Sequence, residues 1–230
     1  MLSIILPAYN EAKRIESAVE RIMEFMNSNF QDFEIIIAED GSTDGTDKVA
    51  EKLAEKYGFV RHLHSDERLG RGKALNNAIK RSEYEFVIYM DVDLSTDLKH
   101  VNDIYEALKA GYDIAVGSRL LKSSRAKRPF TRDLSSRVYN FLVRALLKSG
   151  IHDHQCGFKG FRKSRIADIL DSIADNHWFW DTELLVLAQR KGLKIKEIPV
   201  TWEHGGESKV SILNDSIYML RNIFRIMRKR

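Results

Sequence analysis

Short apolar runs alternate along the first half of the chain with segments in which apolar residues recur every three or four positions. The runs are rich in β-branched and aromatic side chains, which is typical of buried parallel strands. They cover residues 3–7, 33–38, 60–64, 85–90 and 113–117. The segments between them have the spacing of amphipathic helices and cover residues 11–27, 46–57, 72–82 and 100–110. This order predicts an α/β fold with a mostly parallel central sheet and helices on both faces.

The second half of the chain is less regular. Helical spacing continues at residues 134–148, 163–173, 182–191 and 211–228, and a further strand is expected at 194–202. Because no repeat and no Gly/Ser/Pro-rich linker interrupts the chain, we expect one domain over residues 1–210. Residues 211–230 are expected to form an amphipathic basic helix, either as part of that domain or as a contact with a membrane surface.

Polar motifs follow three of the predicted strands at the point where each strand ends. They are Tyr9-Asn10-Glu11, Glu39-Asp40-Gly41-Ser42 and Asp91-Val92-Asp93. In parallel sheets, ligands bind at the carboxyl ends of the strands. The coincidence of the three motifs with that edge predicts a binding site there.

Asp91 and Asp93 follow the apolar run 86–90 and are separated by one residue. Alternate residues of an extended strand point the same way, so we expect both carboxylates to converge on one cation. Oxygen ligands of this kind suit Mg²⁺ or Mn²⁺. The alternative is a pair of acids that caps the following helix.

Composition and charge narrow the class of partner. The net charge is only +4, but residues 122–137 carry six Lys/Arg against one acid, and residues 221–230 carry five basic residues and no acid. Such runs suit phosphates, nucleic acid or an anionic bilayer. We expect no nucleic-acid binding, because aromatic residues are not interleaved with the basic runs and no recognition motif occurs.

The lone cysteine, Cys156, excludes an intramolecular disulfide and fits a reducing compartment. The apolar run at the N-terminus is too short for a signal peptide, and no stretch approaches the roughly 18 apolar residues of a spanning helix. These features predict a cytoplasmic protein, peripheral on the cytoplasmic face of a membrane.

The motifs together resemble the family 2 glycosyltransferases, which have the GT-A fold and invert configuration at the sugar. The resemblance rests on residues 6–11, 39–46, 91–95 and 117–119, then on residues 132, 136–137, 140–141, 155–159 and 206–209. The later motifs are similar to those of the branch that makes dolichyl-phosphate sugars. The match covers nearly the whole chain and implies that residues 1–210 form a GT-A catalytic domain.

The resemblance also implies roles for individual residues. Nucleotide-sugar binding is expected at Pro7, Ala8, Tyr9, Glu11, Ala38, Asp40, Lys73, Asp91, Val92 and Lys209, with Asp40 reading the base. The metal would be bound by Asp91, Asp93 and Ser95, where Ser95 occupies a position at which some relatives have Gln. The catalytic residues would be Asp93, Arg119, Arg132, Ser136 and Asp181, of which Arg119, Arg132 and Ser136, together with Lys209, would grip phosphates.

Residues 154–159 and 178–185 look more like those of dolichyl-phosphate glucosyltransferases than of mannosyltransferases. That resemblance implies a UDP-sugar donor, with glucose or N-acetylglucosamine favoured, and a dolichyl or polyprenyl phosphate acceptor. A membrane surface, and a membrane protein, are further expected partners. The alternatives are a GDP-mannose donor, or a saccharide hydroxyl as acceptor.

The two kinds of acceptor make different demands on the enzyme. A hydroxyl needs a general base, for which Asp181 or Glu183 are candidates, whereas a phosphate monoester is already anionic and needs none. For a lipid phosphate, we interpret the two acids as a helix N-terminus enriched in carboxylates.

Overall fold

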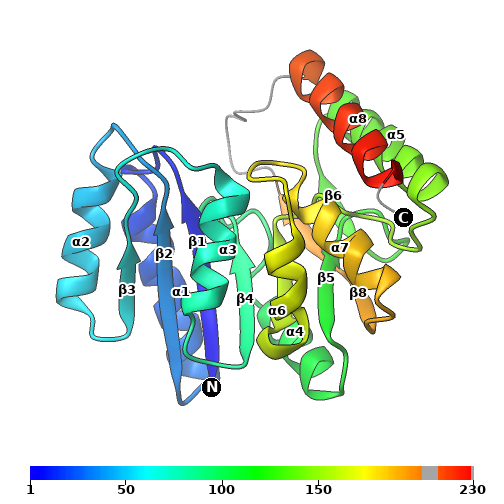
Figure 1. The fold of residues 1–230 in the computed structure, drawn as a ribbon. Coiled ribbons are helices and arrows are strands. Elements are labelled where there is room, and N and C mark those ends of the chain that lie inside the picture. The colour runs from blue at the N-terminus through cyan, green and yellow to red at the C-terminus, as the bar shows by residue number, and fades with distance from the viewer. Residues whose placement is uncertain (204–211, 229–230) are drawn as a thin grey trace.

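A seven-stranded sheet in the order β3-β2-β1-β4-β7-β5-β8 forms the centre of the computed structural model (Figure 1). The structure describes residues 1–203 and 212–228, and in the last segment it describes side chains from residue 217 onward. The strands are β1 (Leu2–Ala8), β2 (Phe33–Glu39), β3 (Val60–Leu63), β4 (Phe86–Met90), β5 (Ile114–Ser118), β7 (Phe158–Arg162) and β8 (Ile195–Pro199). Every pairing is parallel except those of β7, which is antiparallel to both β4 and β5. The predicted α/β class and mostly parallel sheet are confirmed.

Helices cover both faces of the sheet, so the strands are apolar on both sides. The side chains of Ile4 and Leu6 pack with α1 (Ile15–Asn29), α2 (Thr46–Lys56) and α4 (His100–Lys109). Ile5, which points the other way, packs with α3 (Arg71–Arg81), α6 (Lys163–Ser172) and α7 (Trp180–Arg190).

Several boundaries differ from the sequence predictions. The helix expected at 11–27 spans 15–29, and the helix expected at 134–148 begins at Phe130 as α5 (Phe130–Leu147). The strand expected at 194–202 is divided, because the chain leaves β8 after Pro199 and forms β9 (Thr201–Glu203) in a second sheet with β6 (Arg125–Lys127). Neither β6 nor β7 was predicted, because β6 is short and mostly charged, and a lysine and a glycine interrupt the apolar pattern of β7.

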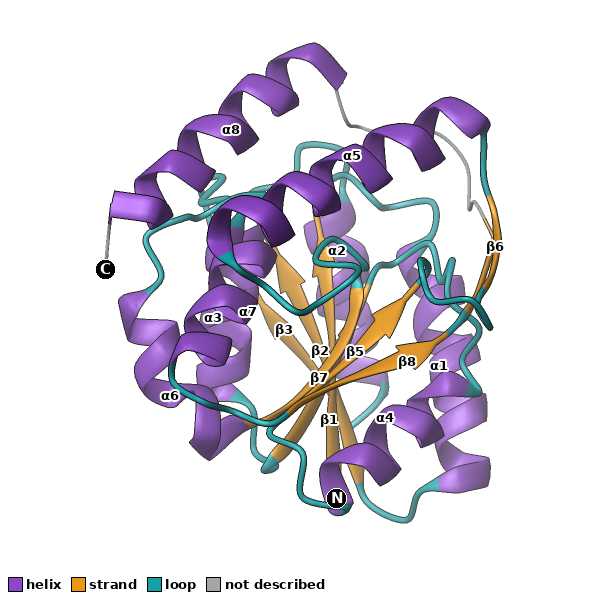
Figure 2. Ribbon diagram, turned by 90° about the vertical axis from the view of Figure 1, so that its right-hand side faces the viewer, coloured by secondary structure: helices purple, strands orange, loops and turns teal. Residues whose placement is uncertain are grey.

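A third layer lies beyond the carboxyl ends of the strands, where α5 and α8 (Ile212–Arg228) run side by side in both views (Figures 1 and 2). A separate small core joins these helices to α7 and includes Val143, Phe179, Ile223 and Ile226. In addition, Arg225 of α8 forms an ion pair with the buried Glu183 at 2.7 Å. Among the described residues, no helix is both long enough and apolar enough to cross a membrane.

Candidate active site

The motif Asp91-Val92-Asp93 forms a turn at the end of β4. The backbone N–H of Leu94 donates to the carbonyl of Asp91 at 3.0 Å, and Leu94 has a positive φ of 47°. The expected extended alternation is therefore wrong, because β4 ends at Met90 and both acids belong to the turn that follows it. Desolvation raises the pKa of Asp91, Arg71 opposes that rise, and the nearby charge of Asp93 adds to it.

Gly157 makes room for the carboxylate of Asp91. Its carbonyl accepts the N–H of Asp91 at 3.1 Å, and a Cβ built on Gly157 would lie only 1.8 Å from Oδ2 of Asp91. Any side chain at this position would displace the carboxylate. The Gln155-Cys156-Gly157 motif thus positions the carboxylate of Asp91, although 66 positions separate Gly157 from Asp91 in the sequence.

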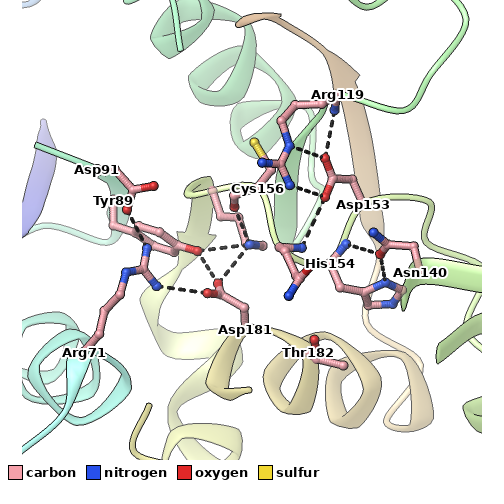
Figure 3. A network of polar contacts seen from close by, with 12 residues as sticks. Arg71, Tyr89, Asp91, Arg119, Asn140, Asp153, His154, Cys156, Asp181 and Thr182 are labelled. Atoms are coloured by element: carbon pink, nitrogen blue, oxygen red, sulfur yellow. Dashed lines mark hydrogen bonds and ion pairs between the residues drawn. The ribbon is translucent and has the colours of Figure 1, made fainter. Parts of the chain in front are cut away.

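A buried network of charges lies behind the turn (Figure 3). Arg71 at the start of α3 bridges two carboxylates, Asp91 Oδ1 at 2.7 Å and Asp181 Oδ2 at 3.0 Å. Lys159 of β7, which is fully buried, donates to Asp181 Oδ1 at 2.8 Å, and the hydroxyl of Tyr89 donates to the same oxygen. Asp181 therefore holds Lys159 and Arg71 together, and Arg71 in turn holds Asp91.

These contacts bear on the two candidate bases. Burial by itself would raise the pKa of Asp181, but Lys159 and Arg71 outweigh it and hold the pKa below its usual value. Glu183 accepts two backbone N–H groups and the guanidinium of Arg225. Cationic partners thus favour the ionised form of Asp181, and hydrogen bonds occupy both oxygens of Glu183, which favours a structural role for the two residues.

The residues expected to bind the nucleoside gather where β1 and β2 end. Pro7 and Ala8 lie in register with Ala38 and Glu39, and the next residue, Asp40, is 3% exposed. The carboxylate of Asp40 accepts the backbone N–H groups of Leu69 at 2.7 Å and Gly70 at 3.0 Å, which fixes the loop before α3. The expected role of Asp40 in reading a base would use its remaining lone pairs.

The loops after β1 and β2 are joined to each other. Asn10, with a positive φ of 54°, donates its N–H to Ser42 Oγ at 3.0 Å and accepts the N–H of Thr43 at 2.8 Å. The N–H of Glu11 donates to Thr46 Oγ1 at 2.8 Å. Residues 42–46, which lead into α2, therefore also hold the loop after β1 in place.

Three other residues were expected to bind the donor. The ring of Tyr9 lies under the guanidinium of Arg68, 3.8 Å from the ring centroid. Lys73 is exposed on α3. Lys209 lies outside the described residues.

Arg119 follows β5 and is anchored by Asp153. Its Nε and Nη2 donate to the two oxygens of that carboxylate at 2.7 and 2.9 Å, a bidentate arrangement. Burial would raise the pKa of Asp153, but the Arg119 guanidinium holds it well below the usual range. The charge of Asp91 also helps to raise the pKa of Arg119, so the acidic turn and this arginine share one electrostatic environment.

A pocket of about 520 Å³ opens between Arg119 and the start of α5. Basic and apolar side chains share its wall: Arg119, Leu120, Leu121, Lys122, Ser124, Ala126, Arg128, Phe130, Asp133 and Arg137. Arg132 and Ser136 belong to the first two turns of α5, although they do not line the pocket.

Arg128 is a site residue that was predicted only as a member of the basic run 122–137. Its side chain is 5% exposed, and Nη2 lies 2.5 Å from Asp133, yet Nε is buried without a hydrogen-bond partner. The hydroxyl of Ser136 is buried and unpartnered as well. Burial and the neighbouring charge of Arg119 lower the pKa of Arg128, so its cation is incompletely compensated. No local signal singles out Arg128, because the fold decides its burial.

Residues 3–170 match the family model described as Glycosyl transferase family 2. The chain belongs to this family.

Two curated relatives are similar over almost the whole chain. Glycosyltransferase AglD of Haloferax volcanii is 45% identical over 97% of the chain, and the dolichyl-phosphate beta-glucosyltransferase of Dictyostelium discoideum is 33% identical over 98%. The chain spans 36% of the length of the first and 73% of the second. The predicted resemblance to the dolichyl-phosphate sugar branch, and the assignment as a glycosyltransferase, are confirmed.

A solved structure agrees in fold at low sequence identity. Glucosyl-3-phosphoglycerate synthase of Mycobacterium tuberculosis, in complex with Mn²⁺, UDP and glucosyl-3-phosphoglycerate, superposes with a TM-score of 0.68 and 19% identity. The match covers 97% of this chain and 77% of that one. The predicted GT-A fold is confirmed.

The buried ion pair of this transferase gives a first prediction. Lys159→Met leaves Asp181 buried with only Arg71 to balance it, and we expect the free energy of unfolding to fall by about 3 kcal/mol. Urea denaturation of the variant checks this, with Lys191→Met at an exposed position as the control. Equal stability of the two variants would contradict the role of the pair.

A second prediction concerns His154, whose ring lies between Asn140 Oδ1 and Ser149 Oγ at 2.8 Å from each. Burial lowers the pKa of His154 to about 3, whereas the unfolded chain has an ordinary histidine pKa near about 6.5. The unfolded state therefore binds the proton first, and stability falls by about 1.4 kcal/mol per pH unit as pH drops below about 6.5. Between pH 6.5 and 5, His154→Gln should show a slope smaller by that amount, and an unchanged slope would refute the assignment.

Proposed function

We propose that the chain transfers a hexose, with glucose favoured over N-acetylglucosamine, from a UDP-sugar to dolichyl or another polyprenyl phosphate, with inversion at the sugar. The name of the Dictyostelium discoideum relative supports this choice of sugar and acceptor. The observation that carries the proposal is the pocket beside Arg119, in which the incompletely compensated Arg128 and apolar side chains share one wall. A lipid phosphate has the matching combination of charge and hydrocarbon.

On the donor side, Asp91 and Asp93 fit Mg²⁺ or Mn²⁺, because both offer carboxylate oxygens and the side chain of Asp91 is 48% exposed. Ser95, whose N–H donates to Asp93 Oδ1 at 3.0 Å, is the proposed third ligand position. The Mycobacterium tuberculosis neighbour in complex with Mn²⁺ and UDP supports the pairing of metal and nucleotide. When bound, such a cation would neutralise the departing diphosphate.

The remaining donor contacts follow the ends of β1 and β2. We assign the nucleoside to Pro7, Ala8, Tyr9, Glu11, Ala38 and Asp40, and the phosphates to Lys73 and Lys209. Arg71, held between Asp91 and Asp181, adds a fixed positive charge beside the carboxylate that faces the diphosphate.

On the acceptor side, Arg119, Arg128, Arg132 and Ser136 hold the phosphate. The Nε of Arg128 and the hydroxyl of Ser136 are buried donors that an oxyanion would satisfy. A phosphate oxygen attacks the anomeric carbon, its bond to that carbon forms, and the bond to the diphosphate breaks with both electrons leaving on the diphosphate. No proton has to be removed, so Asp181 serves as a positioning residue for Arg71 rather than as a base.

The test is transfer of radiolabelled sugar by the purified chain, with dolichyl phosphate and Mg²⁺ or Mn²⁺ present. Label from UDP-glucose should enter an organic-extractable lipid that mild acid hydrolyses. Labelling from GDP-mannose alone would support the mannosyl alternative. Labelling of a free saccharide, or no labelled lipid with any of these donors, would overturn the proposal.

A third prediction isolates the acceptor phosphate. Arg128→Gln removes a charged donor, and we expect the KM for dolichyl phosphate to rise about tenfold, equivalent to about 1.4 kcal/mol, with the KM for the UDP-sugar unchanged. Arg125→Gln, at an exposed position on the neighbouring strand β6, is the matched control and should leave both values unchanged. A parallel rise in both KM values would instead indicate a general loss of structure.

The layer formed by α5 and α8 supports a membrane surface as the second partner. Large apolar side chains stand exposed on both helices and form what we call the apolar helix face: Phe130, Leu134, Val138, Phe141, Ile217, Leu220, Phe224 and Met227. Arg137, Arg221 and Arg228 belong to the same helices, and Phe130 also lines the acceptor pocket. We propose that this face lies on an anionic bilayer, on its cytoplasmic side (Figure 2).

A fourth prediction follows for binding to vesicles. Phe141 is 67% exposed and Phe224 is 52% exposed, so a charge at either position costs little in the free protein. We expect Phe141→Asp with Phe224→Asp to reduce co-flotation with vesicles containing anionic lipid by about tenfold or more. Leu69→Asp adds a charge at an exposed residue outside this face and should float like the unaltered chain. Undiminished flotation of the double variant would exclude the face as the membrane contact.

A further inference from the structure

Three metal-ligating side chains meet where β2 and β3 end. Glu39 ends β2, His62 lies in β3, and His64 follows β3 directly. One carboxylate oxygen of Glu39 and one ring nitrogen of each histidine all lie within 4.8 Å of one another. Within the described part of the chain, no other group of three such residues is assembled in this way.

This cluster is separate from the acidic turn. It belongs to β2 and β3, whereas Asp91 follows β4, and β2 and β1 lie between β3 and β4. With neighbouring strands about 4.8 Å apart, β4 is about 10 Å from β2 and about 14 Å from β3. No residue is shared between the two groups.

One polar atom of the cluster is unsatisfied. The side chain of Glu39 is fully buried, its Oε2 lies 2.6 Å from Nδ1 of His64, and its Oε1 accepts the N–H of Ser42 at 2.5 Å. Nε2 of His62 is buried and has no hydrogen-bond partner. A buried ring nitrogen without a partner is uncommon, because leaving it unsatisfied is costly.

The surroundings favour a cation. The charges of Asp47 and Glu51 on α2 act on His62, and Asp66 lies 3.3 Å from Nε2 of His64. The side chain of His64 is 45% exposed, so an ion can reach the cluster from solvent without opening the fold.

We propose that Glu39, His62 and His64 bind one divalent transition-metal ion, with Zn²⁺ the best match. Two imidazoles and one carboxylate are a common zinc ligand set, completed by water or a further carboxylate such as that of Asp66. Mg²⁺ prefers oxygen ligands, so the cluster selects a different ion from the one that suits Asp91 and Asp93. Zinc ligand atoms lie about 3.4 Å apart in a tetrahedron, which rotation of the exposed His64 side chain can approach.

An ion at this position would stabilise the loop next to the proposed nucleoside site. This consequence rests on the proposed function, whereas metal binding itself does not. Glu39 directly precedes Asp40, whose carboxylate holds the N–H groups of Leu69 and Gly70. Residues 64–70 connect the cluster to Arg71. An ion that joins β2 to residue 64 would therefore fix the start of the loop whose end Asp40 already holds.

The test is calorimetric titration of ZnCl₂ into the untagged, chelator-treated full chain, without substrates. We expect one equivalent to bind, and His62→Ala and His64→Ala to weaken that binding about tenfold to a hundredfold or more. Asp91→Asn should bind zinc like the unaltered chain, which separates the cluster from the acidic turn. Because no transfer is measured, zinc binding can succeed where the transferase assay fails, and the reverse.

A matched control comes from another histidine–carboxylate pair. His152 Nδ1 lies 2.7 Å from Glu197 Oε2, like the pair of His64 and Glu39 but without a second histidine, so His152→Ala should leave zinc affinity unchanged. As a second readout, Co²⁺ should give the visible absorption of a tetrahedral site, and both His62→Ala and His64→Ala should abolish it. Circular dichroism of the metal-free variants verifies folding. Absence of stoichiometric zinc binding, or equal affinity in His62→Ala, would overturn the proposal.

Discussion

The ion pair between Lys159 and Asp181 is the constraint on which the site depends. Lys159 has no exposed surface, so its ammonium is tolerated only because Asp181 and neighbouring oxygens satisfy it. Asp181 also binds Arg71, which reaches Asp91. The chain of alternating charges thus passes from the antiparallel strand β7 through α7 and α3 to the acidic turn. It connects the late part of the sequence to carboxylates that follow an early strand (Figure 3).

The two sides of the site differ in how their charges are balanced. On the donor side, Arg71 and the carboxylates around it neutralise one another. On the acceptor side, Arg119 is paired with Asp153, whereas Arg128 is buried with one nitrogen unpartnered and with a like charge nearby. The fold therefore concentrates unsatisfied positive charge where a phosphate is proposed to bind. It places that position beside an exposed apolar surface.

The layer of α5 and α8 explains how such a surface is maintained. One side of α8 is anchored by the pair of Arg225 and Glu183 and by buried side chains such as Ile223. The opposite side leaves residues such as Phe224 exposed. Because the anchoring is internal, the exposed residues are available for a bilayer without being needed for folding.

Local periodicity in the sequence determined the parallel strands β1 to β5, the helices between them, and the edge at which Asp40 and Asp91 lie, because these features depend on neighbours within a few residues. The sequence motifs further determined the family and named most of the candidate site residues. Tertiary structure alone decided the buried Lys159 in β7, the close fit of Gly157 against Asp91, the burial of Arg128, and the meeting of Glu39 with two histidines. Each of these depends on contacts between distant segments, and the charge of a buried residue such as Lys159 looks like surface until its partner is known.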